Sequence, residues 1–523
     1  MENNSNKEVL NLIENKKSGL IGILFSRVGV AFILILVQFL AVVIAYVLLE
    51  RYFNYVKIVQ LVLQGIMVIY LINTEMDSSA KLTWMFLMMF VPFPAMVLFL
   101  FYQKDIVRQG WKKRLKDLIK ETRGKISQDP FTLIEDDVID SGLDSLCRYL
   151  NRSGRFPVYS DTKVTFFPLG DDKFPAMLEQ LKKAEKFIFM EYFIIDEGYM
   201  WGSILKVLSD KVKEGVDVRV MYDGMCEVNL LTADYPHRMA KLGIKCKPYT
   251  PITPFLTTQY NYRDHRKILV IDGQVAFNGG VNLADEYINQ KERFGHWKDT
   301  AIMLEGKAVQ SFTLMFLQMW NLDENNPQWE EFLAPAKPVP SNGFVMPYGD
   351  CPLFKEKVGE SVYIDILYRA KSYVHIMTPY LILDNELEAA LKFAAERGVD
   401  VKIILPGIPD KKAAYSLAKS HYSSLIRSGV EIYEYTPGFV HAKVFVSDDE
   451  KAVVGTINLD YRSLYHHFEC ATYLYKVDCI SEIKADYKET LKKCKQVTPE
   501  TIKEEKFSYK ALGTLLKVIA PLM

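Results

Sequence analysis

The pattern of apolar and polar positions divides the chain into two parts. Up to about residue 103 the apolar residues come in long uncharged runs, and the first of them, Val28–Leu49, covers 22 residues. As a helix this run is about 33 Å long, enough to cross the roughly 30 Å hydrocarbon core of a bilayer. We therefore predict a membrane span here, because the run is too long and too far from the start for a cleaved signal peptide.

Two more apolar segments follow before the pattern changes. Leu82–Gln103 is again uncharged over 22 residues, but Pro92 and Pro94 interrupt it and should kink the helix or turn it back on itself. Ile58–Asn73 has only 16 residues, which fits either a short span or a segment packed at the membrane interface. The sequence therefore predicts two or three spans.

A basic segment follows the apolar runs. Residues 104–125 contain nine basic and three acidic residues, an excess that marks the cytoplasmic side of a membrane segment. We therefore predict that residues 1–125 form a multi-pass membrane anchor. The remainder of the chain should lie in the cytoplasm.

From about residue 126 the chain alternates strand-like and helical patterns, and the pattern occurs twice. EGVDVRVMYDG (214–224) returns as RGVDVKIILPG (397–407), and AEKFIFMEYFIID (184–196) is matched by AKSYVHIMTPYLILD (370–384). The spacing, near 180 residues, is far too long for a solenoid and indicates a duplicated α/β domain.

The internal boundary is expected in APAKPVPSNG (334–343), which combines three prolines and a glycine. The predicted organisation is thus an anchor over 1–125, a first α/β lobe over 126–335 and a second over 336–523, the second ending in an amphipathic tail.

One phrase in each half combines chemically active side chains. HRKILVIDG, which begins at His265, returns as HAKVFVSDD, which begins at His441. In a strand, residues two apart point to the same side, so His265 and Lys267 share one side, as do His441 and Lys443. An imidazole beside an ammonium group is suited to a phosphate ester.

Each phrase continues into a turn and a corner of small residues. Asp272 and Asp448 lie in the turns, and the corners end at Asn282 and Asn458. We take both aspartates as candidate catalytic residues, although an Asp in a hairpin turn needs no chemistry to explain it. The two carboxamides, beside glycine N–H groups, are candidates for holding phosphate oxygens.

An acidic residue follows each corner. HWKDTA (296–301) and HFECAT (467–472) align Asp299 with Glu469. A carboxylate on the far ring nitrogen of a catalytic histidine fixes its tautomer. We therefore predict Asp299 and Glu469 as supporting acids, and interpret His296, His466 and His467 as neighbours of these acids.

Composition excludes several classes of site. Lys plus Arg and Asp plus Glu both number 64, so the chain lacks the global positive field of nucleic-acid binders. Its seven cysteines are scattered without a CxxC, and no clustered carboxylates resemble a divalent-metal site. We expect no metal, no other cofactor and no nucleic-acid partner.

The paired H-x-K-x4-D-x6-G-[GS]-x-N phrases resemble the phospholipase D superfamily. With YNYRDHRK, GGVNLADEY and GTINLDYRSLYHHFE, the chain is most similar to bacterial cardiolipin synthases over nearly its whole length. A departure is Gly280, where the first corner lacks the family's Ser hydroxyl; Cys470, after Glu469, is a second, small difference.

The resemblance implies two α/β/α sandwich lobes whose histidine phrases meet at one active site. It also implies transfer of a phosphatidyl group from one phosphatidylglycerol to another through a phosphohistidine, with release of glycerol, at the bacterial inner membrane among anionic lipids. By analogy His265 is the nucleophile and His441 the acid and base, although the pseudo-symmetry makes the reverse chemically plausible.

Alternatives remain open at this stage. A membrane-anchored phospholipase D that hydrolyses lipids, or a synthase that uses phosphatidylethanolamine as donor, would carry the same residues. A bell-shaped pH profile is expected, but the acids raise the basicity of the histidines while the lysines lower it. Which effect dominates is left open by the sequence.

Overall fold

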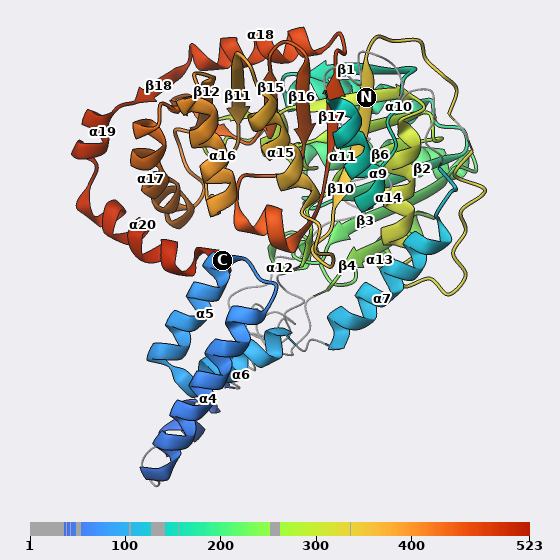
Figure 1. Cartoon of the computed structure of the whole chain (residues 1–523). Helices are drawn as coiled ribbons and strands as arrows, with labels where there is room; N and C mark the ends of the chain where they lie inside the picture. The colour runs from blue at the N-terminus through green and yellow to red at the C-terminus, as the bar shows by residue number, and fades with distance from the viewer. Residues whose placement is uncertain are drawn as a thin grey trace.

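The computed structural model shows two α/β lobes with a group of helices below them (Figure 1). It describes residues 36–37, 39–41, 43–48, 54–103, 106–126, 142–154, 156–251, 262–334 and 336–522.

The described part of the first lobe is built on a seven-stranded mixed sheet. In spatial order its strands are β1 (Thr162–Phe167), β9 (Ala301–Gly306), β7 (Val275–Gly279), β6 (Lys267–Ile271), β2 (Phe187–Tyr192), β3 (Asp217–Asp223) and β4 (Lys245–Tyr249). The central strands are buried throughout, as their continuous apolar patterns predict.

The second sheet repeats this order and adds one strand at its edge. Its path is β10 (Phe344–Asp350), β17 (His467–Tyr475), β16 (Lys451–Gly455), β15 (Val444–Ser447), β11 (Tyr373–Met377), β12 (Asp400–Pro406), β13 (Glu431–Tyr435) and β18 (Cys494–Val497). Seven strands therefore correspond one to one, and the predicted α/β fold is confirmed.

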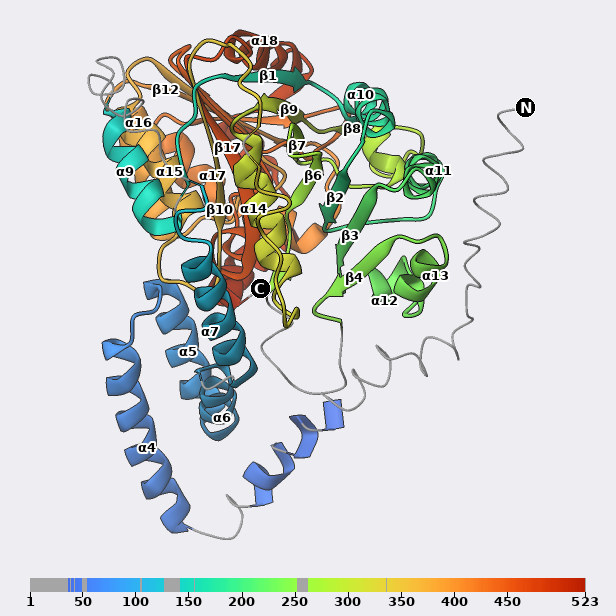
Figure 2. The same ribbon diagram turned by 90° about the vertical axis from the view of Figure 1, so that its right-hand side faces the viewer.

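Helices cover both sheets and also fill the space between the lobes (Figure 2). One apolar core lies under α10 and α11 in the first lobe, and another under α9, α15 and α16 in the second. A third core combines apolar residues of both sheets with α7, α14 and α18, so the lobes share buried surface. These helices are α7 (Ile106–Glu121), α9 (Leu143–Gly154), α10 (Gly170–Lys182), α11 (Tyr199–Lys213), α14 (Val309–Trp320), α15 (Val358–Arg369), α16 (Asn385–Glu396) and α18 (Ile480–Leu491).

Two short strands cross from one lobe to the other. β5 (Arg263–Asp264) pairs in parallel with the beginning of β17. Reciprocally, β14 (Gly438–Val440) of the second lobe pairs in parallel with β8 (His296–Lys298) of the first. β5 and β14 immediately precede His265 and His441. Each histidine therefore lies next to the other lobe.

The N-terminal helices differ from the predicted spans. The apolar run Leu82–Gln103 is divided between α5 (Ser78–Phe90) and α6 (Pro92–Gln103), with Val91 outside helical geometry between them. Proline lacks an amide hydrogen and disfavours helical geometry in the preceding residue, so the helix ends before Pro92. The predicted interruption of this run at Pro92 is therefore confirmed.

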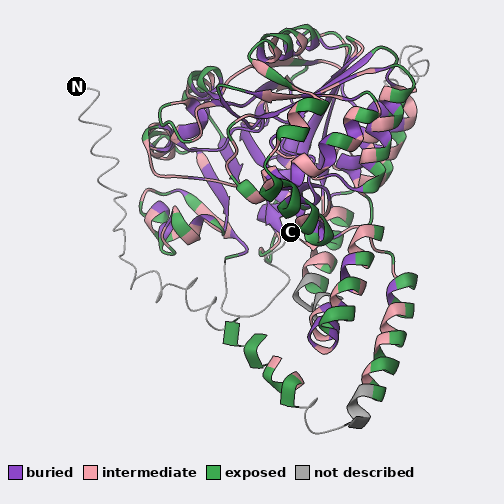
Figure 3. Ribbon diagram, turned by 90° about the vertical axis from the view of Figure 1, so that its left-hand side faces the viewer, coloured by how far each residue is buried: buried purple, intermediate pink, exposed green. Residues whose placement is uncertain are grey.

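Within the described residues, the structure contains no helix with both the length and the apolar character that crossing a bilayer requires. The segment Ile58–Asn73 lies in α4 (Asn54–Asn73). Many apolar side chains of α4 are exposed (Figure 3). Half of the first predicted span, Val28–Leu49, lies outside the described residues.

The C-terminal helix α20 (Phe507–Ile519) packs on α17 (Lys412–Arg427). A side chain at Gly513 would come within 2.3 Å of the Ser416 carbonyl oxygen, so the two helices are in close backbone contact. The opposite face of α20 leaves Phe507 and Leu515 exposed. Thr83 of α5 also donates a hydrogen bond to the Val518 carbonyl oxygen of α20, which joins the N-terminal helices to the C-terminal one.

Candidate active site

His265 is held by the second lobe. Its Nδ1 lies 2.9 and 3.0 Å from the two carboxylate oxygens of Glu469, and its backbone N–H donates to the Phe468 carbonyl oxygen. Both side chains are buried. The carboxylate therefore accepts the Nδ1 proton and leaves the Nε2 lone pair available to react.

His441 is held in the same way by the first lobe. Its Nδ1 lies 2.6 Å from Asp299 Oδ2, and its backbone N–H donates to the Lys298 carbonyl oxygen. The structure thus brings together both predicted histidines and both predicted acids, but each acid serves the histidine of the other lobe.

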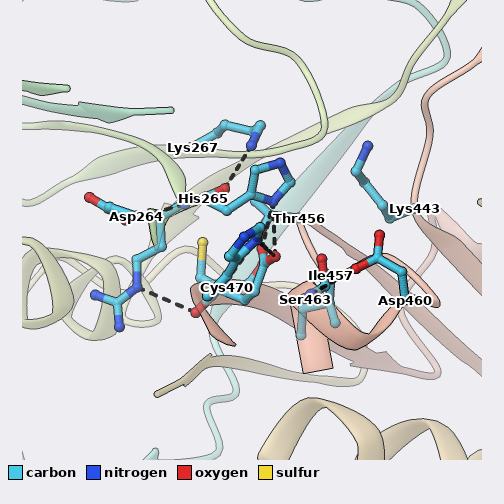
Figure 4. Close-up of polar contacts among 12 residues, drawn as sticks. Asp264, His265, Lys267, Lys443, Thr456, Ile457, Asp460, Ser463 and Cys470 are labelled. Carbon is cyan, nitrogen blue, oxygen red and sulfur yellow. Dashed lines mark hydrogen bonds and ion pairs between the residues drawn. The ribbon is translucent and has the colours of Figure 1, made fainter. Parts of the chain in front are cut away.

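The two motif lysines lie beside these histidines. Lys267 Nζ donates to the His265 carbonyl oxygen at 2.6 Å, and Lys443 Nζ donates to that of His441. Figure 4 shows both lysine side chains reaching toward the same side of the His265 ring. Burial lowers the pKa of Lys267 to about 8 and that of Lys443 to about 7. The two ammonium groups therefore form a buried positive site for an anion.

Burial and the lysines together decide the basicity of the histidines. Burial, with the charge of Lys443, lowers the pKa of His441 to about 4, although Asp299 opposes the shift. Burial and the charge of Lys267 lower the pKa of His265 well below its usual value. In the absence of a phosphate anion, both rings are therefore neutral near pH 7.

The two acids differ in their surroundings. Burial raises the pKa of Glu469 well above its usual range, whereas His441, Lys443 and the Thr300 N–H outweigh burial and hold that of Asp299 below its own. Glu469 Oε2 also accepts a hydrogen bond from the Thr456 hydroxyl.

The corresponding corner of the first lobe leaves no space for a hydroxyl. Gly280 stands where the second lobe has Thr456, and a Cβ there would lie 2.0 Å from Asp299 Oδ1. The absent Ser hydroxyl noted in the sequence is thus explained by the Asp299 carboxylate, which occupies that space.

Asp272 and Asp448 are not part of this cluster. One strand, about 17 Å, separates Asp272 from Lys267. Its carboxylate accepts three backbone N–H groups, each at 2.8 Å, from residues 185–187, and Asp448 accepts three from residues 371–373. Their expected catalytic role is corrected accordingly: both carboxylates fix the start of a neighbouring strand.

The two predicted phosphate-binding asparagines are engaged within the protein. Asn282 accepts from the Ile194 N–H at 3.1 Å and donates to the Tyr287 hydroxyl at 2.8 Å. Asn458 Oδ1 has no hydrogen-bond partner among the described residues, although its side chain also contacts Asp460. Contact of either residue with phosphate stays a prediction.

Two site residues were missed in the sequence. His467 lies against His265, with ring centroids 5.4 Å apart, whereas Trp297 lies at 5.4 Å from His441. His467 therefore corresponds to Trp297. Counting two residues back from each acid would have given this correspondence.

The second missed residue is Lys173 of α10. It is buried, and its Nζ is within 3.5 Å of the Tyr192 hydroxyl and 3.4 Å of the Val281 carbonyl oxygen. Burial lowers its pKa to about 7, with Asp299 and Lys267 close enough to affect it. No motif marks this lysine, because a lone Lys in a helix is ordinarily exposed.

Comparisons with known proteins agree with this architecture. A family model described as "Cardiolipin synthase, PLD-like domain" matches residues 177–320 and 363–491, each segment containing one histidine phrase. The crystal structure of a phosphatidylserine synthase from Haemophilus influenzae superposes with a TM-score of 0.55 at 17% identity, covering 72% of this chain and 99% of that one. At this identity the likeness shows a shared fold alone.

Sequence relatives are more specific. An uncharacterized protein of Streptococcus mutans is 59% identical over 465 residues, which are 87% of this chain and 99% of that protein. Cardiolipin synthases of Alkalihalophilus pseudofirmus and Geobacillus kaustophilus are 33% and 34% identical over 381 residues, covering 72% of this chain and 76% of each relative. With the family model matched in both lobes, the chain belongs to the cardiolipin synthase family of phospholipase D-like proteins.

Proposed function

We propose that this phosphatidyltransferase moves a phosphatidyl group from one phosphatidylglycerol to a second and releases glycerol, so that cardiolipin is formed. The observation that carries the proposal is the pairing of two imidazoles with two buried ammonium groups, each ring oriented by a carboxylate from the opposite lobe. The cardiolipin synthase relatives support the substrate.

The first step is attack on phosphorus by His265 Nε2. Its strongly lowered pKa keeps this ring neutral, as a nucleophile must be. His441 is assigned as the proton carrier by analogy with the family, and a bound phosphate anion raises its basicity. Protonated His441 gives its proton to the leaving glycerol oxygen as the P–O bond breaks, which leaves a phosphatidyl-histidine.

The second step reverses these roles. Neutral His441 removes the proton from a hydroxyl of the second phosphatidylglycerol, whose oxygen displaces His265 from phosphorus. Lys267 and Lys443 stabilise the charge on the non-bridging oxygens in both steps. One phosphodiester replaces another, so the reaction needs no nucleotide, and we propose that it needs no metal.

We propose further that the enzyme works against a lipid surface. Apolar side chains are exposed on neighbouring helices, including Leu61 of α4, Phe90 of α5 and Leu515 of α20. This proposal includes the expected anchor over Val28–Leu49 and a cytoplasmic position of the lobes. The uncharged run and the basic residues of 104–125 support it. Such a location supplies the acceptor lipid at high local concentration.

The deciding experiment uses purified full-length protein and phosphatidylglycerol as the only lipid. We expect equal amounts of free glycerol and a four-chain lipid by mass spectrometry. Phosphatidic acid as the only product would instead establish the hydrolase. Adding phosphatidylethanolamine with a labelled headgroup tests the other donor, because labelled ethanolamine would then be released.

A further inference from the structure

A third imidazole lies next to the reactive ring of His265 and shares its acid. His467 Nδ1 is 3.5 Å from Glu469 Oε1, the oxygen that also lies 2.9 Å from His265 Nδ1. Only 8% of the His467 surface is exposed, and neither of its ring nitrogens has a hydrogen-bond partner in the part of the chain that the structure describes. Buried polar nitrogens are ordinarily paired, so this arrangement calls for a ligand.

The other half of the site shows what packing alone would require. At the equivalent position beside His441 stands Trp297, at the same centroid distance of 5.4 Å and with nearly the same ring tilt, 45° against 42°. An indole fills this space without offering a metal ligand. An imidazole in the same place also packs against the neighbouring ring, and in addition it supplies nitrogen atoms that can bind a metal.

We propose that His265, His467 and Glu469 form an inhibitory binding site for a divalent cation of the Zn²⁺ type. Their ligand atoms all lie within 4.8 Å of one another. Ligands about 2.1 Å from a tetrahedral zinc ion are about 3.4 Å apart, close to the separations of 2.9 and 3.5 Å found here. Two imidazoles and one carboxylate are zinc ligands in proteins and leave the fourth position open for water.

The affinity should be moderate. The ammonium group of Lys267 lies close enough to Glu469 to oppose the binding of a dication. We therefore expect binding in the micromolar range, which suits a reversible inhibitor better than a permanent structural ion.

Inhibition follows from the tautomer of His265, and this step rests on the proposed function. A neutral imidazole carries one proton. When the metal takes the Nδ1 lone pair, that proton must reside on Nε2, whose lone pair then belongs to an N–H bond. The ring cannot attack phosphorus in this form, and removal of the ion restores the original tautomer with Nδ1–H facing Glu469.

The test measures glycerol release from phosphatidylglycerol by the full-length chain at increasing ZnCl₂, and each variant is compared with its own rate without metal. Wild type should lose about tenfold in rate at micromolar zinc and recover with a chelator. His467→Phe keeps an aromatic ring but loses the donor, so its half-inhibiting zinc concentration should rise about 100-fold. His467→Gln serves as a second variant if His467→Phe does not fold.

Two controls separate this site from other effects. Glu386→Gln alters the other described cluster of possible ligands, Glu360, Asp384 and Glu386, and should leave zinc inhibition unchanged. Trp297→Phe changes the equivalent aromatic residue and should also leave it unchanged. Equal zinc sensitivity of His467→Phe and wild type would overturn the proposal, as would an insensitive wild type.

Metal binding is also measured without turnover. Wild type should bind one Co²⁺ per chain with a visible absorption band that His467→Phe lacks. A metal-free enzyme that releases no glycerol, but shows this band once Co²⁺ is added, would reject the proposed function and leave the metal site intact. Absence of the band in an active enzyme would reject the metal site alone.

Discussion

His441 Nδ1 lies 2.6 Å from Asp299 Oδ2, although 142 positions separate these residues in the sequence. His265 and Glu469, separated by 204 positions, make the reciprocal contact. Each reactive ring thus depends for its orientation on an acid that the other lobe carries.

The first prediction concerns this orientation. Asp299→Asn should lower kcat by about 10³- to 10⁴-fold with little change in KM, because an amide cannot hold the Nδ1–H tautomer of His441 as a carboxylate does. Steady-state kinetics at several phosphatidylglycerol concentrations measure both constants. Glu292→Gln, at an exposed acid of the same lobe, is the matched control. A change confined to KM would contradict the assigned role.

The second prediction distinguishes the two histidines. With a phosphatidyl ester of p-nitrophenol, whose leaving group needs no proton, His441→Ala should still release about one p-nitrophenolate per enzyme and then stall. His265→Ala should release none, because it lacks the nucleophile. Rapid-mixing absorbance detects the burst, and His237→Ala, at an exposed histidine, should behave as wild type. A burst from His265→Ala would reverse the assignment.

The third prediction concerns alkaline pH. The lowered pKa of Lys443, about 7, means that this group is charged below that pH and loses its charge above it. Because phosphate binding needs the charge, kcat/KM should fall as the pH rises through this value. Lys443→Arg carries a guanidinium that stays protonated, so its decline should move up toward the pKa of Lys267, about 8. An identical alkaline limb in both enzymes would exclude Lys443 as its cause.

The fourth prediction follows from the crowded first corner. Gly280→Ser places a Cβ where Asp299 Oδ1 now lies, so the carboxylate must move away from His441. We expect kcat to fall about 10- to 100-fold while the melting temperature changes little. Gly110→Ala is the control, since nothing lies within 4 Å of its added Cβ. Full activity of Gly280→Ser would show that the Asp299 carboxylate can take another position and still orient His441.

The fifth prediction separates stability from chemistry. Asp272→Ala leaves three backbone N–H groups without their acceptor and should lower the free energy of unfolding by about 1–3 kcal/mol. The fraction that remains folded should keep a kcat close to that of wild type. Urea unfolding and kinetics on the same preparation measure the two effects. A large loss of kcat at unchanged stability would return Asp272 to the catalytic residues.

The repeated phrases made much of the site predictable. The repeated phrase predicts two His–Lys pairs, and both are found. The strand period of two did not place them, because β6 begins at Lys267 and β15 at Val444, after the histidines. The acids could be named from the sequence, but not that they act across lobes, because parallel pairing of β5 with β17 is a long-range contact that no local pattern records. The same contact sets the register that makes His467 correspond to Trp297.

The N-terminal region shows the opposite case. Hydropathy over Leu82–Gln103 left open whether the prolines would kink one helix or turn the chain back, and the backbone constraint at Pro92 divides the run into two helices. Similarly, Asp272 and Asp448 were taken as catalytic candidates from their motif, while their contacts are purely with backbone amides.

The reciprocal exchange of β5 and β14 between the lobes has an evolutionary consequence. A single ancestral lobe would lack the acid for its own ring, so it could have worked only as a dimer of two identical copies. Joining the copies in one gene released them from that identity. Gly280 could then diverge from Thr456, and Trp297 from His467, so that one polypeptide now has two unlike halves at one reaction centre.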